Sequence, residues 1–218
     1  MNIHIVTIFP GMFDSYINES ILSRGQEEGI LSFSFHDPRE KTEDAHKTMD
    51  DRPYGGGPGM VMKAEPILKT INEIIGSLEG DFEVILFSPS GEQFDNTLAR
   101  KYAKETENLV LVCGRYEGID SRVEQVLRDT YPEQTTTLSI GPYVLTGGEL
   151  AALVLSDAVA RHIPGVLGNE SSPEEERTAS SQMYTRPETF EWNGKEYSVP
   201  DVLLSGHHEN IEKWREEN

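Results

Sequence analysis

Three short segments of this chain combine glycine with charged or hydroxyl-bearing side chains, a composition that suits small-molecule binding. They begin at Ser88, Gly114 and Gly141 and read SPSG, GRYEG and GPYVLTGGE. Each follows an apolar, β-branched run typical of a buried strand. Because ligands of parallel sheets bind beyond the carboxyl ends of the strands, the segments are predicted to meet at one pocket. Taken alone, each is more typical of an ordinary strand-to-helix turn.

The predicted pocket lacks the usual nucleotide-binding fingerprints. No GxGxxG follows a predicted strand, and no GxxxxGK[ST] is present. The glycine run at 55–59 contains Pro58 and follows a polar loop, so it does not resemble a dinucleotide-binding turn. Glycine allows close approach of the backbone, and we therefore expect backbone groups, above all in 141–149, to hold an adenosine-type ligand by the edge of its adenine.

Other kinds of chemistry have weaker support. Cys113 ends an apolar run, which is typical of a buried core thiol rather than a nucleophile. The six histidines show no metal-ligand spacing. Arg161 ends an apolar run, and Arg52 and Tyr54 precede the glycine run, where an RNA base could stack on either side chain. A simple turn is the alternative interpretation of that last segment.

The order of elements indicates how these segments are positioned. Strands are predicted over residues 2–9, 30–35, 82–87, 109–113 and 136–140. Helices are predicted over residues 12–28, 61–75, 96–102, 118–127, 149–161 and 210–217. Such alternation predicts an α/β fold, with a mostly parallel sheet and helices on both faces. Residues 36–59 read as a long polar loop, which is typical of functional or disordered segments.

Bulk composition limits the class of protein. One cysteine excludes a disulfide within the chain, and no run reaches the ~18 apolar residues of a spanning helix, so we expect a cytoplasmic protein with no membrane partner. The 38 acidic and 19 basic residues give a net charge of −19. This balance argues against nucleic-acid binding through net charge but allows a local basic patch. Adaptation to high salt is another explanation of the acidity.

Six stretches of the chain match the motifs of one known family. They are DDRPYGGGPGM (50–60), LVCGRYEGID (111–120), SIGPYVLTGGEL (139–150), RHIPGVLGNE (161–170), YTRPE (184–188) and VPDVLLSGHHENIEKWR (199–215). Through these stretches, which span nearly the whole chain in the family's order, the chain resembles the bacterial tRNA (guanine-N1)-methyltransferases of the SPOUT class.

The resemblance implies a homodimer with a deep trefoil knot, which holds S-adenosylmethionine. It implies three parts of the chain: a knotted cofactor-binding domain over 1–167, a flexible linker over 168–181 and a shortened RNA-binding segment over 182–218. The cofactor contacts carried over are Leu86, Ser88, Pro89, Gly114, Glu117, Ile140, Gly141, Pro142, Tyr143, Val144, Leu145, Gly147 and Gly148. Magnesium supports the family's reaction, and Glu117 is at a position that could serve it.

The reaction implied is methyl transfer to N1 of the guanosine next to the anticodon on its 3′ side, in tRNA and not in DNA. Arg161 matches the family's catalytic arginine, and Glu176 stands where the family has a catalytic aspartate. Glu175 is the neighbouring alternative. Pro142 also replaces a usual aspartate. The expected RNA contacts are Arg52, Tyr54 and Arg186.

Two other interpretations of the sequence remain open. The first is a module that binds the cofactor or RNA with weak or no turnover, because the base is altered and the C-terminal segment is short. The second is a methyltransferase of the same class that acts on another RNA.

Overall fold

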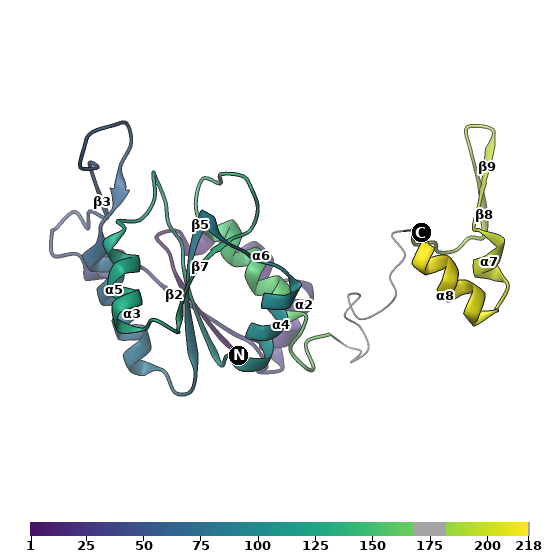
Figure 1. Ribbon diagram of the computed structural model, residues 1–218, viewed down its shortest axis with the longest axis horizontal. Coiled ribbons are helices and arrows are strands. Elements are labelled where there is room, and N and C mark those ends of the chain that lie inside the picture. The colour runs from purple at the N-terminus through teal and green to yellow at the C-terminus, as the bar shows by residue number, and fades with distance from the viewer. Residues whose placement is uncertain (168–181, 218) are drawn as a thin grey trace. The chain divides into compact units, whose positions relative to one another are not determined.

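The computed structural model describes residues 1–167 and 182–217, and the chain divides into two compact units, Met1–Gly168 and Asn169–Asn218. The first unit is built on a sheet of five parallel strands in the order β2-β1-β6-β5-β7. Figure 1 shows this sheet with helices on both sides of it. The strands are β1 (Asn2–Val6), β2 (Ser32–His36), β5 (Phe82–Gln93), β6 (Asn108–Val112) and β7 (Thr135–Ser139). The predicted α/β fold with a parallel sheet is confirmed.

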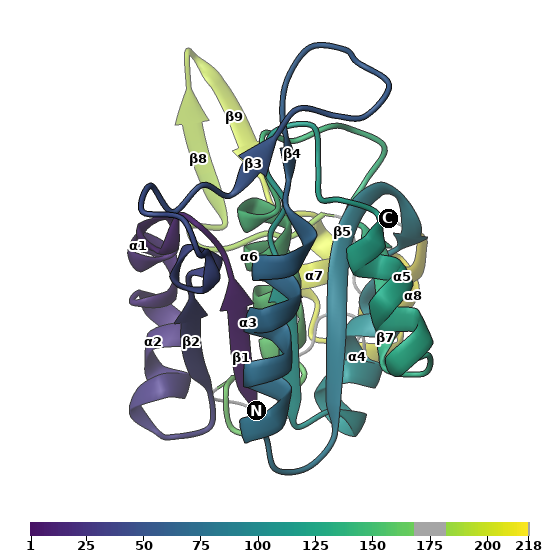
Figure 2. The same ribbon diagram turned by 90° about the vertical axis from the view of Figure 1, so that its left-hand side faces the viewer.

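Alternating side chains of the central strands bury two separate cores. Ile3, Ile5 and Leu111 pack with α1 (Asp14–Ile17), α2 (Ser20–Glu27), α4 (Asn96–Glu105) and α6 (Glu149–Ala160). Val6, Val84 and Val110 face the other side of the sheet and pack with α3 (Ala64–Ser77) and α5 (Arg122–Thr130). All five residues of β6 are buried, as expected for a strand covered on both faces. Figure 2 shows the strands side by side, with α3 in front of the sheet.

The prediction of one continuous helix over residues 12–28 was wrong. Residues 12–28 divide into the end of a 3₁₀ turn (Pro10–Met12), α1 and α2. Ser20, the first residue of α2, has a φ of +54°, a conformation that a helix continuous with α1 does not permit. β1 ends at Val6 rather than Phe9, which leaves Thr7–Phe9 as a connection at the carboxyl end of the strand.

The long polar loop predicted over 36–59 contains regular structure. A 3₁₀ turn (Pro38–Lys41) follows β2, and β3 (Asp50–Asp51) pairs antiparallel with β4 (Val61–Met62). α3 therefore begins at Ala64 rather than Val61. Its Ile67, Ile71 and Ile74 recur at helical spacing and are buried against the sheet.

The second unit has a β-hairpin and two helices. β8 (Thr189–Trp192) and β9 (Lys195–Ser198) pair antiparallel, and α7 (Asp201–Leu204) precedes α8 (His208–Glu217). The predicted helix at 210–217 is confirmed, while the hairpin and α7 were not predicted. Asn193 and Gly194 both have positive φ at the turn, and Asn-Gly is the sequence signal that identifies such a hairpin.

Across the residues that the structure describes, no helix is long and apolar enough to cross a membrane. The predicted linker at 168–181 lies outside these residues.

Candidate functional site

The three glycine-bearing segments converge on one cavity, as predicted. It has a volume of about 450 Å³, within the usual range for small-molecule sites. Its walls come from the middle of β5 (86–90), from the segment after β6 (114–121), and from β7 with the segment that follows it (137–148). The cavity therefore lies at the carboxyl ends of parallel strands.

The first wall is a bulge within a strand, which corrects the prediction that this strand ends at Phe87. Phe87 and Glu92 both pair with Leu138, so residues 88–91 leave the ladder and β5 then resumes. A Cβ on Gly91 would lie 2.6 Å from the Thr137 backbone oxygen. Only glycine fits there, and the bulge brings Ser88 and Pro89 to the cavity.

The second and third walls are joined through their backbones. The Gly148 N–H donates to the Gly114 carbonyl at 2.9 Å, and Arg115 forms an isolated bridge with Gly147. A Cβ on Gly148 would lie 2.8 Å from the Cys113 Cα. Because β5 lies between β6 and β7, this hydrogen bond joins segments that follow two strands that are not neighbours in the sheet.

A buried ion pair reinforces this junction. Arg115 Nε lies 2.9 Å from Glu149 Oε2, and the two side chains are 13% and 3% exposed. The Thr7 hydroxyl donates to Glu149 Oε1 at 2.9 Å and accepts from the Phe9 N–H at 2.9 Å. The Arg115 guanidinium also lies 4.8 Å from the centre of the Phe9 ring. Glu149 begins α6, where the helix dipole favours a negative charge.

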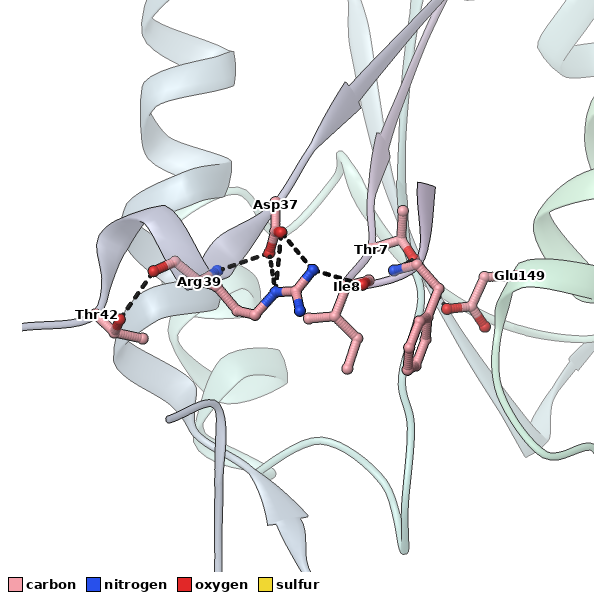
Figure 3. A network of polar contacts seen from close by, with 7 residues as sticks. Thr7, Ile8, Asp37, Arg39, Thr42 and Glu149 are labelled. Carbon is pink, nitrogen blue, oxygen red and sulfur yellow. Dashed lines mark hydrogen bonds and ion pairs between the residues drawn. The ribbon is translucent and has the colours of Figure 1, made fainter. Parts of the chain in front are cut away.

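The connection after β1 is fixed by a second ion pair. Arg39 Nη2 lies 2.7 Å from Asp37 Oδ2 and donates to the Ile8 carbonyl at 2.8 Å (Figure 3). Figure 3 also shows Thr7 within this connection and Glu149 on its side away from Arg39. Charged residues that follow β2 thus hold the connection after β1 in place.

The turn after β7 is tight, and this explains the position of Pro142. The Tyr143 N–H donates to the Gly141 carbonyl at 2.9 Å, so Pro142 occupies the apex of a three-residue turn. Pro142 is not among the residues that line the cavity. The Tyr143 hydroxyl donates to the Ile140 carbonyl at 3.0 Å, and a Cβ on Gly141 would overlap the Tyr143 ring. Glycine at this position lets the ring lie against the turn.

The structure brings the other predicted cofactor residues together. Those that line the cavity are Leu86, Ser88, Pro89, Gly114, Glu117, Ile140, Gly141, Tyr143, Val144, Leu145, Gly147 and Gly148. Arg115, which lines the cavity, was a charged candidate near the glycine turns but was not among the predicted cofactor contacts, and neither were Glu149 and Thr7, which support the walls. For Arg115 and Glu149 a signal was present, because both charges adjoin the glycines of the motifs. Thr7 follows an apolar strand and gave no such signal.

The glycine-rich arm over 50–60 is attached to the second wall. The Glu117 N–H donates to the Met60 carbonyl at 3.0 Å, and the Met62 N–H donates to the Gly118 carbonyl at 2.9 Å. A Cβ on Gly59 would lie 2.5 Å from Glu117 Cγ. The arm carries Tyr54, which is fully exposed, so an aromatic ring is available to an external partner.

The remaining predicted residues are placed less completely. Arg161 follows the last residue of α6 and is partly buried, and Arg186 lies in the second unit, before a cis peptide bond. Glu175 and Glu176 lie outside the described residues.

Two expectations about reactivity concern side chains in the described part of the chain. Burial raises the pKa of the Cys113 thiol well above its usual value, and the prediction that this thiol is buried is confirmed. Within residues 1–167 and 182–217, no three histidine, cysteine or carboxylate side chains gather as a metal site would require.

Comparison with known proteins gives one consistent result. A family model described as tRNA (Guanine-1)-methyltransferase TrmD matches residues 1–218. A tRNA (guanine-N(1)-)-methyltransferase from Thermomicrobium roseum is 47% identical over 99% of this chain and 77% of its own length. Relatives of the same name from Geobacillus kaustophilus and Dictyoglomus turgidum are each 46% identical over 99% of this chain, and over 85% and 83% of their own lengths.

Proposed function

The chain belongs to the tRNA (guanine-1)-methyltransferase family, and on that basis we propose that it transfers a methyl group from S-adenosylmethionine to N1 of guanine in tRNA. The target is the guanosine next to the anticodon on its 3′ side. The observation that carries the proposal is that three motifs far apart in the sequence form the walls of a single cavity.

The cavity is suited to S-adenosylmethionine. Gly114, Gly141 and Gly147 line it, and glycine lets the backbone approach an adenine edge closely because no side chain intervenes. Leu86 and Leu145 provide apolar surface, and Ser88 and Glu117 provide polar groups. When bound, the cofactor supplies a methyl group on a positively charged sulfur, and a neutral thioether remains after transfer.

The reaction requires a base. Guanine N1 carries a proton and is a poor nucleophile until that proton leaves. We assign its removal to the carboxylate of Glu176, which would act within hydrogen-bond reach of N1. The freed electron pair of N1 then forms the new bond to the methyl carbon. Glu176 keeps the carboxylate of the family's aspartate and adds one methylene group to its reach.

Arg161 has the complementary role. Loss of the N1 proton places negative charge on guanine O6, and a fixed guanidinium near that oxygen stabilises the charge as it develops. Arg161 directly follows α6, the helix that begins at the cavity with Glu149.

The knot and the homodimer are further parts of the proposal. The hydrogen bond between Gly148 and Gly114 joins segments that follow two strands separated by β5, and this supports a crossing of the chain at this point. Exposed apolar side chains on α6 and near α1 support a dimer, and they are Met12, Tyr16, Leu150 and Val154. A second copy that covers this surface would remove it from water.

The proposed architecture assigns different roles to the parts of the chain. Residues 1–167 bind the cofactor, residues 168–181 connect the two parts, and residues 182–218 help to bind tRNA. Arg52, Tyr54 and Arg186 are the proposed RNA contacts, with Tyr54 available for stacking on a base. Such a substrate places the protein in the cytoplasm.

We assign magnesium a supporting role in the reaction, with the Glu117 carboxylate as its protein ligand. Mg²⁺ commonly takes only one or two protein carboxylates and completes its shell with water and substrate oxygens, so a single side chain is sufficient. Titration of magnesium after chelation with EDTA should restore methyl transfer to wild-type protein. A Glu117→Gln variant should need more magnesium.

Methyl transfer to an unmodified tRNA transcript with guanosine after the anticodon tests the function and its base. Label from the cofactor should appear at N1, and Glu176→Ala should lower kcat by at least about 100-fold, in the range of general-base catalysis. Glu175→Ala is the matched control and should retain activity. The reverse result would move the base to Glu175.

Binding measurements distinguish the alternatives. Calorimetry that detects S-adenosylmethionine binding, combined with a folded dimer that leaves N1 unlabelled, would favour a binding module. Label at a different nucleotide or in another RNA would redirect the substrate assignment.

A further inference from the structure

The β8–β9 hairpin of the second unit has two chemically different faces. In its antiparallel register, Phe190 is opposite Tyr197 and Trp192 is opposite Lys195. Directly opposed residues project from the same face of a hairpin, and residues two apart share a face. Three aromatic rings and one cation therefore lie together. We call Phe190, Trp192, Lys195 and Tyr197 the aromatic face.

The opposite face carries acids and hydroxyls. Glu191 is opposite Glu196, and Thr189 and Ser198 are opposite each other, with their hydroxyls 3.0 Å apart. The aromatic face therefore contains no carboxylate of the hairpin, although the chain as a whole is strongly acidic.

The rings of the aromatic face are ordered and exposed. Phe190 and Tyr197 stack with centroids 5.5 Å apart and an angle of 18° between their planes. Lys195 Nζ lies 5.2 Å from the centre of the Tyr197 ring. Trp192, Phe190 and Tyr197 are 65%, 53% and 43% exposed. Clustered aromatic rings left in water are typical of a binding surface.

The second unit offers no core that could bury these rings. None of residues 182–217 is buried, and no ring contact found within the described residues involves Trp192. The rings are therefore available to a partner rather than being part of the unit's own packing.

We propose that the aromatic face is a stacking platform for unpaired bases of tRNA, a proposal that rests on the proposed function. Aromatic side chains bind single-stranded nucleic acid because every base offers a flat π-surface. Lys195 lies among the rings, where it can contact a phosphate of the nucleotides stacked beside it. A face that combines rings with a cation can therefore contact both the bases and a phosphate of one strand.

The charge of the chain favours this mode of binding. A net charge of −19 leaves little affinity to be gained from a large basic surface and counterion release. Stacking does not depend on net charge. An aromatic face with the hairpin's acids on its far side therefore gives an acidic protein a means of binding RNA that tolerates salt.

Binding of an unmodified tRNA transcript to the full-length protein tests the platform. Trp192→Ala should weaken binding and raise KM for tRNA by about 10-fold, which corresponds to the loss of one stacked base. It should leave kcat and the affinity for S-adenosylmethionine unchanged. Trp192→Phe should restore most of the tRNA affinity, because a ring remains. Glu191→Gln, on the opposite face and one residue away, is the matched control and should bind as the wild type does.

Salt dependence separates stacking from charge. The effect of Lys195→Ala should shrink as potassium chloride rises from about 50 to about 300 mM, because phosphate contacts weaken with salt. The effect of Trp192→Ala should persist.

Two results would overturn the platform. One is a Trp192→Ala protein that binds tRNA as tightly as the wild type. The other is a change in particle mass by light scattering in this variant, which would assign the face to a protein contact. Since binding is measured without turnover, wild-type protein that binds tRNA but transfers no methyl group would contradict the proposed function alone.

Discussion

At the scale of single residues, Glu149 shows how a buried charge can serve the proposed site without lining it. Its two carboxylate oxygens contact Thr7 and Arg115, which lie in segments that follow β1 and β6. One side chain thus connects the start of α6 to two strand ends. The sequence shows Glu149 as an acid after two glycines, but it does not show the contacts of this side chain with Thr7 and Arg115.

Loss of the Glu149 carboxylate should destabilise the protein. Glu149→Ala leaves Arg115 without its buried counter-charge, and we expect the free energy of unfolding to fall by about 3 kcal/mol. The affinity for S-adenosylmethionine should fall as well, because the second and third cavity walls separate. Urea denaturation and calorimetry would measure the two effects.

Glu65 provides the matched control. It pairs with Lys69 at 2.9 Å, and the Glu65 and Lys69 side chains are 73% and 42% exposed. Glu65→Ala should therefore cost less than about 1 kcal/mol. Equal losses for the two variants would contradict the role assigned to the Glu149 ion pair.

At the scale of elements, the bulge in β5 decides where the first cavity wall stands. Residues 88–91 leave the ladder with β7 and the strand then returns to it. No periodic pattern marks this excursion, because Ser-Pro-Ser-Gly is a typical end of a strand. Gly91 is the residue that allows the return, because β7 backbone occupies the space of its Cβ.

Gly91→Ala should therefore disrupt the bulge. The new Cβ would meet backbone atoms of Thr137 and Leu138 at 2.6–2.8 Å, which cannot move as a side-chain end can. We expect a loss of about 2 kcal/mol in unfolding free energy and weaker cofactor binding. Differential scanning calorimetry and cofactor titration would record both.

A second glycine provides a control, because its replacement should raise the free energy of unfolding. Gly76 lies in α3 and has nothing within 4 Å of its Cβ position. Gly76→Ala should stabilise the protein by about 0.5–1 kcal/mol, because alanine has the higher helix propensity. A neutral Gly91→Ala would show that the bulge tolerates a side chain.

At the scale of the whole molecule, the free energy of unfolding should depend on a histidine pair that joins β1 and β2. His4 Nδ1 and His36 Nε2 lie 3.2 Å apart. Burial is the main cause that lowers the pKa of each, and the charge of His36 further lowers that of His4. Glu73 and Glu40 oppose the shift at His36, while Lys41 adds to it.

This pair should make the fold less stable in acid. Both histidines have a lower pKa in the folded state than the unfolded value of about 6.5, so the unfolded chain binds more protons. The pair's contribution is complete above the unfolded pKa and is lost as the pH falls below it, through the folded values. Urea midpoints between about pH 7.5 and about pH 5 would follow the loss.

A variant isolates the histidine contribution from that of the many carboxylates. His4→Asn removes one titrating group and the like charge beside His36. Its midpoint should fall less steeply over the same pH range. Parallel curves for the variant and the wild type would assign the acid sensitivity elsewhere.

The sequence by itself determined the parallel sheet, the glycine-bearing strand ends and the family resemblance. Apolar runs such as 109–113 have few alternatives to a buried strand, and glycine motifs are local signals. The chemical roles of individual residues, including Arg161 and Glu176, were inferred from those motifs and remain predictions.

Only the tertiary structure decided how the walls of the cavity meet. The order of strands places β5 between β6 and β7, and the bulge at Gly91, the contact of Gly148 with Gly114 and the Arg115–Glu149 ion pair depend on that order. These contacts join residues more than 30 positions apart. Local propensity carries no information about such partners, because their energy arises only when the packed sheet brings the segments together.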